Sequence, residues 1–183
     1  MTHGPSSMPR ITLIGYRGCG KTTVAAELSR LLECDWEDAD AELERACGFT
    51  IAELIGVRGE QAFRDLETEI LENLCGSPGI LATGGGVVLR PENRAMLRGR
   101  CRPVVWLTAP AGIVRARLAA DPMTAARRPS LSGRDPLDEV AAVMAERDAL
   151  YRECADHVVD TTHAPADAIA AAIADWLERE WRP

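Results

Sequence analysis

The sequence predicts an α/β protein in which a parallel sheet carries helices on both faces. Short runs of β-branched and aliphatic residues recur along the chain, and longer stretches with the period of an amphipathic helix separate them. A glycine-rich turn follows the first of these runs and leads directly into a helical stretch. Strands that alternate with helices imply parallel pairing, so these observations together favour a parallel sheet.

Five strands and the helices between them follow from this periodicity. The expected strands cover residues 11–14, 35–38, 79–83, 104–107 and 157–160. The expected helices cover residues 21–33, 41–47, 51–57, 61–74, 91–98, 111–120, 137–155 and 165–181. Ligands of such folds bind beyond the carboxyl ends of the strands, so functional residues are expected in the segments that follow them.

The length of 183 residues favours one domain, expected over residues 10–183. Residues 1–9 contain Gly, Pro and Ser but no apolar run, and we expect them to form a disordered leader. Residues 121–135 are rich in Pro, Ser, Gly and Arg, with little periodicity, and we expect a mobile lid there. The sequence has no signal peptide and no run of about 20 apolar residues, which favours a cytoplasmic protein with no membrane partner.

The net charge and the spacing of the cysteines argue against a nucleic-acid-binding protein and against a protein held together by zinc or disulfides. The net charge of −7 argues against non-specific nucleic-acid binding, which requires a basic face. The six cysteines are scattered, with no C-x-x-C pair, so we expect reduced thiols of a cytosolic protein and no zinc or disulfide framework.

The segment from Gly15 to Thr22, GYRGCGKT, fits the P-loop pattern G-x-x-x-x-G-K-[ST] and lies between a strand and a helix. In a P-loop, backbone N–H groups surround the phosphates, the lysine reaches the β- and γ-phosphates, and the hydroxyl binds Mg²⁺. The expected contacts to ATP come from Gly18, Cys19, Gly20, Lys21, Thr22 and Thr23. Lys21 and the helix N-terminus are expected to favour the thiolate of Cys19, a residue to which we assign no catalytic role.

Two acids, Asp38 and Asp40, follow the second strand, whereas the third strand ends in glycines. In an extended segment, alternation places both carboxylates on one side. One can then hold Mg²⁺ through water while the other accepts a proton from a substrate hydroxyl. The alternative is that Asp40 serves only as the N-cap of the next helix.

A cleft for an anionic acceptor is suggested by arginines and glycines. Arg64 can bind a carboxylate with its forked guanidinium, or it can form a surface ion pair with Glu60 or Glu67. Gly84 to Gly86, directly after a core strand, permit close approach of backbone to ligand, unless they form a plain loop.

Two further arginines lie later in the chain. Arg128 lies in the expected lid and can stabilise a transferring phosphate, or it can belong to a solvated charge run. Arg147 can be a second clamp for the substrate, or a partner of Glu146, Asp148 or Tyr151.

Taken in order, these motifs resemble shikimate kinase, and the likeness runs from about residue 11 to about residue 176. The residues that carry it are Gly15 to Thr22, Asp38-Ala39-Asp40, Phe63-Arg64, Gly84-Gly85-Gly86, Arg128-Pro129, Arg147 and Leu150-Tyr151. The resemblance implies a P-loop kinase with strand order 2-3-1-4-5. It also implies phosphorylation of the 3-hydroxyl of shikimate by ATP, in the pathway to chorismate and the aromatic amino acids.

The resemblance also implies roles for individual residues. Thr22 and Asp38 hold Mg²⁺, and Asp40 is the catalytic base. Catalysis further involves Lys21 and Arg128. The shikimate carboxylate is held by Arg64 and Arg147, while the backbone of Gly84, Gly85 and Gly86 contacts the ring. Arg117 and Pro165 lie on the adenine side, and the enzyme is expected to be a monomer.

The lid departs from the family pattern. It reads Arg128-Pro129-Ser130-Leu131 where the family has Arg-Pro-Leu-Leu, and the segment between Arg117 and Arg128 is about four residues longer.

Two other functions compete with this one. Another small-metabolite kinase, such as gluconate kinase, is disfavoured because the triple glycine and the paired arginines suit a cyclic carboxylate. A non-catalytic ATP-binding module is disfavoured because such a module has no need of both Asp38 and Asp40.

Overall fold

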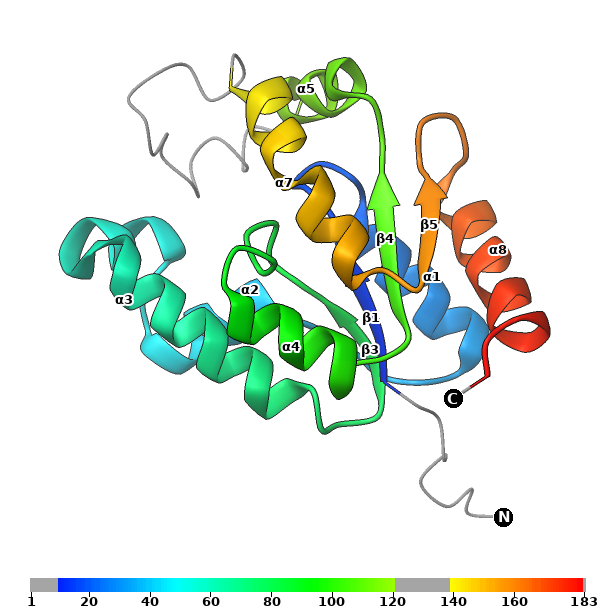
Figure 1. The fold of residues 1–183 in the computed structure, drawn as a ribbon, viewed down its shortest axis with the longest axis horizontal. Coiled ribbons are helices and arrows are strands. Elements are labelled where there is room, and N and C mark those ends of the chain that lie inside the picture. The colour runs from blue at the N-terminus through cyan, green and yellow to red at the C-terminus, as the bar shows by residue number, and fades with distance from the viewer. Residues whose placement is uncertain (1–9, 121–138, 183) are drawn as a thin grey trace.

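The computed structural model describes residues 10–120 and 139–182. The expected leader at residues 1–9 and the expected lid at residues 121–135, with Arg128, lie outside the described residues. Within the described part, a five-stranded sheet forms the centre of the molecule and helices cover it (Figure 1).

The sheet has the strand order β2-β3-β1-β4-β5, and every neighbouring pair is parallel. The strands are β1 (Arg10–Ile14), β2 (Trp36–Asp38), β3 (Gly79–Ala82), β4 (Val104–Thr108) and β5 (His157–Asp160). The predicted fold class, the predicted strands and the strand order are therefore confirmed. Because β1 and β3 are neighbours and both run toward the same edge, the P-loop after β1 and the glycines after β3 lie beside each other.

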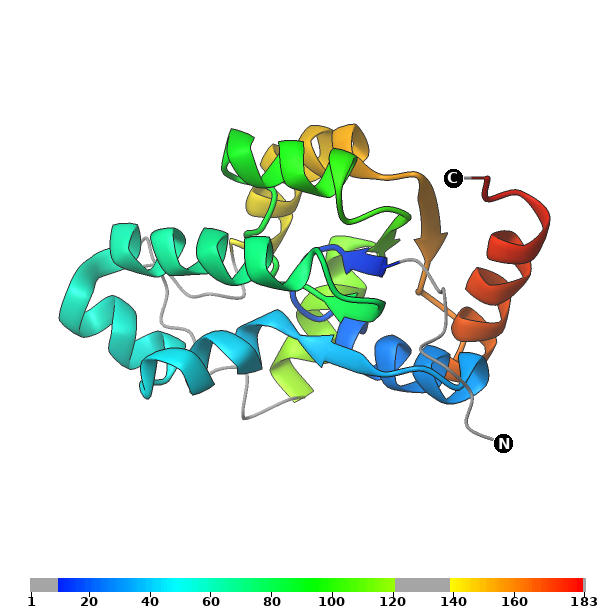
Figure 2. The same cartoon turned by 90° about the horizontal axis from the view of Figure 1, so that it is seen from below.

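The helices occupy the stretches predicted from periodicity. They are α1 (Lys21–Leu32), α2 (Ala39–Cys47), α3 (Ile51–Leu74), α4 (Pro91–Gly99), α5 (Ala111–Ala120), α7 (Val140–Cys154) and α8 (Ala166–Arg179). Figure 2 shows α1 and α8 packed against each other on one side of the sheet, with α3 and α4 on the other side.

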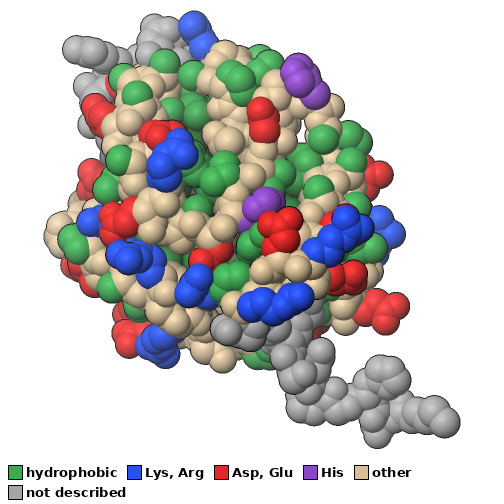
Figure 3. All heavy atoms as spheres, turned by 45° about the vertical axis from the view of Figure 1, so that its right-hand side comes forward, with side chains coloured by type: hydrophobic (Ala, Val, Ile, Leu, Met, Phe, Trp, Pro, Cys, Tyr) green, Lys and Arg blue, Asp and Glu red, His purple; other side chains and the backbone are tan. Residues whose placement is uncertain are grey.

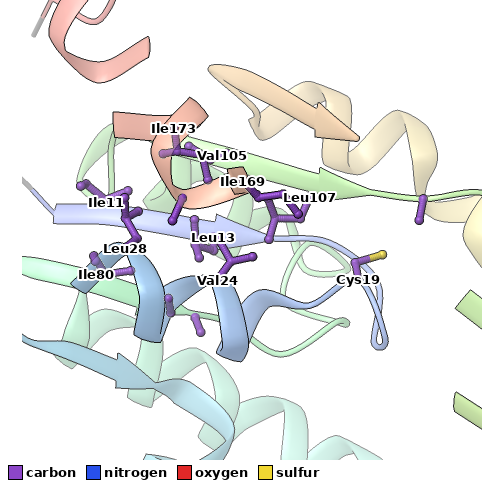
Figure 4. Packing of buried hydrophobic residues seen from close by; sticks show 14 of the residues in the cluster. Ile11, Leu13, Cys19, Val24, Leu28, Ile80, Val105, Leu107, Ile169 and Ile173 are labelled. Carbon is purple, nitrogen blue, oxygen red and sulfur yellow. The ribbon is translucent and has the colours of Figure 1, made fainter. Parts of the chain in front are cut away.

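Two clusters of buried aliphatic side chains lie on the two faces of the sheet, and alternation along each strand supplies both. Leu13 of β1 and Leu107 of β4 belong to the cluster under α1 and α8 (Figure 4), whereas Ile14 and Trp106 belong to the cluster under α3, α4 and α7. All five residues of β1 are buried. This double burial fixes the position of β1, and hence of the P-loop that follows it.

Helix α3 consists of two helical pieces joined at Gly59, as the separate predictions for residues 51–57 and 61–74 imply. Gly59 has φ 83° and ψ 165°, a conformation that glycine adopts without the steric cost of a Cβ. A capping box formed by Thr50 and Glu53 starts the first piece. The second piece carries Arg64 and Glu67, so the bend sets the direction in which these two residues approach the sheet.

The segment around Asp40 differs from the sequence prediction. Strand β2 ends at Asp38, and α2 begins at Ala39, so Asp40 lies in the first turn of a helix and not in an extended segment. The N-cap is Asp38, whose side chain accepts hydrogen bonds from the backbone N–H groups of Asp40 and Ala41. Strand alternation was therefore the wrong reason for placing the two carboxylates on one side. The alternative, that Asp40 is the N-cap, is also wrong, because Asp38 is the N-cap.

The prediction that all six cysteines are reduced is also wrong. Cys75, directly after α3, forms a disulfide with Cys101, which lies between α4 and β4, and their Cα atoms are 4.9 Å apart. Cys19, Cys34, Cys47 and Cys154 are free thiols. The disulfide links the two connections that enter β3 and β4, at the end of the sheet opposite the P-loop.

On the face shown in Figure 3, lysine and arginine side chains lie among aspartate and glutamate side chains. No helix in the part of the chain that the structure describes is long and apolar enough to cross a membrane.

Candidate active site

The P-loop connects β1 to α1 and depends on glycine at the start of the helix. Gly20, the N-cap of α1, has φ 86°, in the left-handed region that glycine favours. Lys21 is 9% exposed, and its ammonium group donates to the carbonyl oxygens of Gly15, at 2.8 Å, and Tyr16, at 3.1 Å. The lysine therefore holds the loop closed on itself while its charge stays at the position where a P-loop binds phosphate.

The expected metal ligands lie next to each other. The hydroxyl of Thr22 donates to Oδ2 of Asp38 at 2.8 Å, while Oδ1 of Asp38 caps α2. Since the hydroxyl proton points at the carboxylate, the lone pairs of the Thr22 oxygen remain available to a cation. Among residues 10–120 and 139–182, no group of three or more His, Cys, Asp or Glu could hold a metal ion. This pair suits Mg²⁺, which keeps several waters and takes its other ligands from phosphates.

Asp40 lies against the glycine segment that follows β3. A Cβ added to Gly84 would lie 2.6 Å from Oδ1 of Asp40 and 3.0 Å from Oε1 of Glu67. Both carboxylates thus contact the backbone at Gly84 so closely that no side chain fits between them. Asp40 and Gly84, which the sequence analysis both assigned to the substrate site, are therefore neighbours in the structure.

Arg64 forms ion pairs with both of the acids that its spacing suggested. Its Nη1 lies 2.7 Å from Oε2 of Glu67, and its Nη2 lies 3.3 Å from Oε1 of Glu60. The pair with Glu67 is shielded, because the side chains of Arg64 and Glu67 are 11% and 6% exposed, whereas the pair with Glu60 reaches the surface, where the Glu60 side chain is 47% exposed. A Cβ on Gly86 would collide with the guanidinium of Arg64, so the absence of a side chain there makes room for the arginine.

Arg147 reaches the same glycine segment from the other side. Its Nη1 donates to the carbonyl oxygen of Gly85 at 3.0 Å, and the hydroxyl of Tyr151 donates to the same oxygen. Tyr151 is buried, and burial raises the pKa of its phenol well above the ordinary value, so it remains a hydrogen-bond donor. Arg64 and Arg147 are therefore both placed at the glycines, from α3 and α7 respectively.

A cavity of about 760 Å³ opens along the P-loop. Its walls include the P-loop from Arg17 to Thr23, then Asp38, Asp40, Thr83, Gly85, Arg117, Thr161 and Ala164. The predicted nucleotide residues Gly18, Cys19, Gly20, Lys21, Thr22 and Thr23 all lie on this wall. The other predicted substrate residues do not line this cavity, although each contacts Asp40 or a residue of the glycine segment: Gly84, Gly86, Arg64 and Arg147.

Of the two residues predicted on the adenine side, Arg117 lines the cavity and Pro165 does not. The guanidinium of Arg117 donates to the carbonyl oxygen of Gly18 at 3.4 Å and to the hydroxyl of Thr161 at 3.0 Å. It therefore bridges the P-loop and the loop after β5. Pro165 is the N-cap of α8 and is not part of the wall, although its neighbours Ala164 and Ala166 are.

The expectation of a thiolate at Cys19 is wrong. Cys19 is 1% exposed, and this burial raises the pKa of the thiol above its ordinary value, although the charges of Lys21 and Arg117 act in the opposite direction. The sequence shows the neighbouring lysine and the helix N-terminus but not the burial. The thiol packs with the core cluster that Figure 4 shows.

Several residues of the site were missed by the sequence analysis. Trp36, Glu44 and Ile51 line the same cavity, at positions that carry no motif. Arg17 also lines it, at a P-loop position that the pattern leaves open. Its charge was the only signal in the sequence that could have singled it out.

Comparison with known proteins decides the family. The model of the family described as shikimate kinase matches residues 17–178. The chain belongs to the shikimate kinase family. It is 44% identical to shikimate kinase 2 of Enterobacter sp. (strain 638) over 160 residues, which are 87% of this chain and 91% of that protein.

The fold agrees with solved structures of this family. A shikimate kinase from Acinetobacter baumannii, solved in complex with shikimate, superposes with a TM-score of 0.87 at 34% identity, over 96% of this chain and 97% of that one. A gluconokinase from Sinorhizobium meliloti 1021 superposes with a TM-score of 0.53 at 15% identity, over 95% of this chain and 98% of that one. The second likeness shows the fold alone.

Proposed function

We propose that this protein transfers the γ-phosphoryl group of ATP to the 3-hydroxyl of shikimate, giving shikimate 3-phosphate and ADP. The observation that carries the proposal is the convergence of Asp40, Arg64 and Arg147 on one glycine segment beside the P-loop. This arrangement places an acceptor for a hydroxyl proton next to cations suited to a carboxylate.

In this proposal, the nucleotide lies along the cavity wall from Gly18 to Thr23. The P-loop N–H groups and Lys21 stabilise the negative charge of the phosphates. Thr22 would bind Mg²⁺ directly and Asp38 through water. Mg²⁺, when bound, neutralises part of the phosphate charge. Arg117 borders the adenine end with the loop that carries Thr161.

At the acceptor, Asp40 orients the 3-hydroxyl and takes its proton. The hydroxyl oxygen forms the new bond to phosphorus, the bond between the γ-phosphorus and the bridging oxygen breaks, and ADP leaves. Arg64 and Arg147 hold the carboxylate, and the Gly84–Gly86 backbone contacts the ring. Arg128 completes the site from the lid, outside the described residues.

A coupled assay of ADP release tests this function. Wild-type protein with ATP and Mg²⁺ is expected to release ADP rapidly with shikimate, and not with gluconate or without an acceptor. Lys21→Ala is expected to retain less than about a tenth of the turnover, because both the loop closure and the phosphate contact are lost. Faster turnover with gluconate than with shikimate would support a gluconate kinase. If neither acceptor increases the release of ADP, the protein is a non-catalytic ATP-binding module.

We also propose that the enzyme acts as a monomer in the cytoplasm, without a nucleic-acid partner. The net charge of −7 supports the last point. The Cys75–Cys101 disulfide argues against a cytoplasmic location, because disulfide bonds are disfavoured in a reducing compartment. Gel filtration with and without reductant tests the oligomeric state.

A further inference from the structure

Arg17 occupies the third position of the P-loop and is one of the residues that line the cavity. Its backbone lies next to the glycine segment, since a Cβ added to Gly85 would be 3.0 Å from the backbone nitrogen of Arg17. Arg17 is thus located where the P-loop meets the residues proposed to hold the acceptor.

The guanidinium of Arg17 has no hydrogen bond or ion pair with any residue in the described ranges 10–120 and 139–182. Its Nε is buried without an acceptor. The guanidinium lies over the ring of Tyr16, whose centroid is 5.8 Å from Cζ of Arg17. A buried cationic N–H without a partner is costly, so such a group on a cavity wall indicates a ligand that supplies the missing anion.

The other arginines of the acceptor site differ in how their charge is balanced. Arg64 is paired with Glu60 and Glu67, so most of its charge is already neutralised within the protein. Arg147 donates to the neutral carbonyl of Gly85, and its Cζ also lies 5.8 Å from the Tyr16 ring centroid. Arg17 and Arg147 are therefore two cations around one aromatic ring, and within the described residues neither has a carboxylate partner.

We infer that Arg17 binds the carboxylate of the acceptor together with Arg147, and that it determines the selectivity for an anionic acceptor. The inference rests on the proposed function. An aromatic ring attracts both guanidinium groups without neutralising them, so Tyr16 can keep two positive charges close together. A carboxylate between them would supply the acceptor that the Arg17 Nε lacks. In the proposed function, Lys21 and the P-loop N–H groups bind the phosphates. Arg17 is not needed there, and its guanidinium lies over the Tyr16 ring, which it shares with Arg147.

Kinetics of Arg17→Met, which keeps the length of the side chain but removes its charge, test this role. We expect the KM for shikimate to rise about tenfold or more, the KM for ATP to change less than about twofold, and kcat to remain near the wild-type value. Arg17→Lys should recover part of the affinity, because it restores the charge without the fork. Arg58→Met is the matched control, since Arg58 is exposed and lies over Phe49, 5.4 Å from the ring centroid and away from the cavity.

A neutral acceptor makes the test specific for the carboxylate. With the methyl ester of shikimate, wild-type and Arg17→Met proteins should differ in kcat/KM by less than about twofold, because the anion is absent. The inference is overturned if the substitution costs as much with the ester as with shikimate. It is also overturned if the loss appears in kcat or in the KM for ATP, which would place Arg17 at the phosphates.

Two controls separate this inference from the proposed function and from misfolding. A wild-type protein that does not phosphorylate shikimate refutes the function itself, whereas an active wild type with an unchanged Arg17→Met refutes only the role of Arg17. Fluorescence titration of Arg17→Lys with shikimate, with thermal melting as the check of folding, gives a second measure of affinity. Wild-type affinity in Arg17→Lys together with unchanged kinetics in Arg17→Met would likewise refute the role.

Discussion

The guanidinium of Arg147 donates to the backbone carbonyl of Gly85 at 3.0 Å and thereby links α7 to the segment that follows β3. Because the hydroxyl of Tyr151 donates to the same oxygen, this part of the backbone is held by two donors from one helix. A side chain added to the glycine segment must therefore displace its neighbours, since the backbone itself is fixed.

Gly84→Ala should disable the acceptor site. The added Cβ would lie 2.6 Å from Oδ1 of Asp40 and 3.0 Å from Oε1 of Glu67, so both carboxylates must shift. We expect kcat/KM for shikimate to fall by at least about tenfold, because small displacements of catalytic groups are costly. Steady-state kinetics measure this loss.

Gly56→Ala is the control. Gly56 lies in α3, with nothing within 4 Å of the new Cβ, so the substitution should leave the kinetics unchanged and stabilise the fold by about 0.5–1 kcal/mol. Equal kinetic losses in both variants would contradict the steric argument.

Arg64→Ala should impair binding of the acceptor more than binding of the nucleotide. Removing one partner of a shielded arginine–carboxylate contact commonly costs about 2–5 kcal/mol, so the KM for shikimate should rise by roughly 30- to 4,000-fold. The KM for ATP should change little. Glu67 also loses its ion pair, so urea unfolding should show a lower stability. If both KM values rise equally, Arg64 is a structural residue and the carboxylate is bound elsewhere.

Asp40→Asn should impair chemistry and preserve binding. The amide keeps the shape of the side chain but cannot take the hydroxyl proton, so kcat should fall by about 10²-fold or more. Nucleotide affinity, measured by fluorescence titration, should stay at the wild-type value because Asp38 caps α2 and contacts Thr22 independently. A near-normal kcat would show that Asp40 only positions the hydroxyl.

Cys19 should react slowly with alkylating agents at neutral pH. Burial raises the pKa of its thiol, so at a given pH the reactive thiolate fraction is smaller than for an ordinary cysteine, and the rate should be higher in alkaline than in neutral solution. Peptide mapping after treatment with iodoacetamide at pH 7.5 and at pH 9.5 measures the rate. The half-buried Cys47 serves as the internal reference and should react faster at pH 7.5. Faster modification of Cys19 than of Cys47 at that pH would show that Lys21 and Arg117 outweigh burial.

The Cys75–Cys101 disulfide should lower the number of titratable thiols and raise the free energy of unfolding. Without reductant, thiol titration of the denatured protein should detect the four cysteines Cys19, Cys34, Cys47 and Cys154, and with reductant all six. Closing a loop over a sequence separation of 26 residues should contribute about 3 kcal/mol to the unfolding free energy, which reduction removes. Detection of six thiols in unreduced protein would refute the bond, and Cys34→Ser is the control that removes a thiol without affecting it.

Hydrophobic periodicity predicted nearly every strand and helix, because most of these elements either have one apolar face or, like β1, are buried on both faces. The break in α3 was also predicted, since Gly59 interrupts the pattern. The resemblance to shikimate kinase supplied the strand order, which periodicity cannot provide.

The errors arose where distant segments meet. Cys75 and Cys101 are brought together by the pairing of β3 and β4 with β1, which local patterns do not encode. Burial of Cys19 comes from its packing within the core cluster, whereas the sequence shows only its charged neighbour. The start of α2 at Ala39 was missed because Asp38 completes a strand and caps a helix at once.

This double use of Asp38 restricts which residues can replace it. Its Oδ1 caps α2, while its Oδ2 accepts the hydroxyl of Thr22. Asparagine would preserve the cap but not the charge, and glutamate would preserve the charge but is a poorer cap. Two independent demands, one on folding and one on cation binding, fall on the same side chain. Evolution could therefore improve neither property by substitution here without loss of the other.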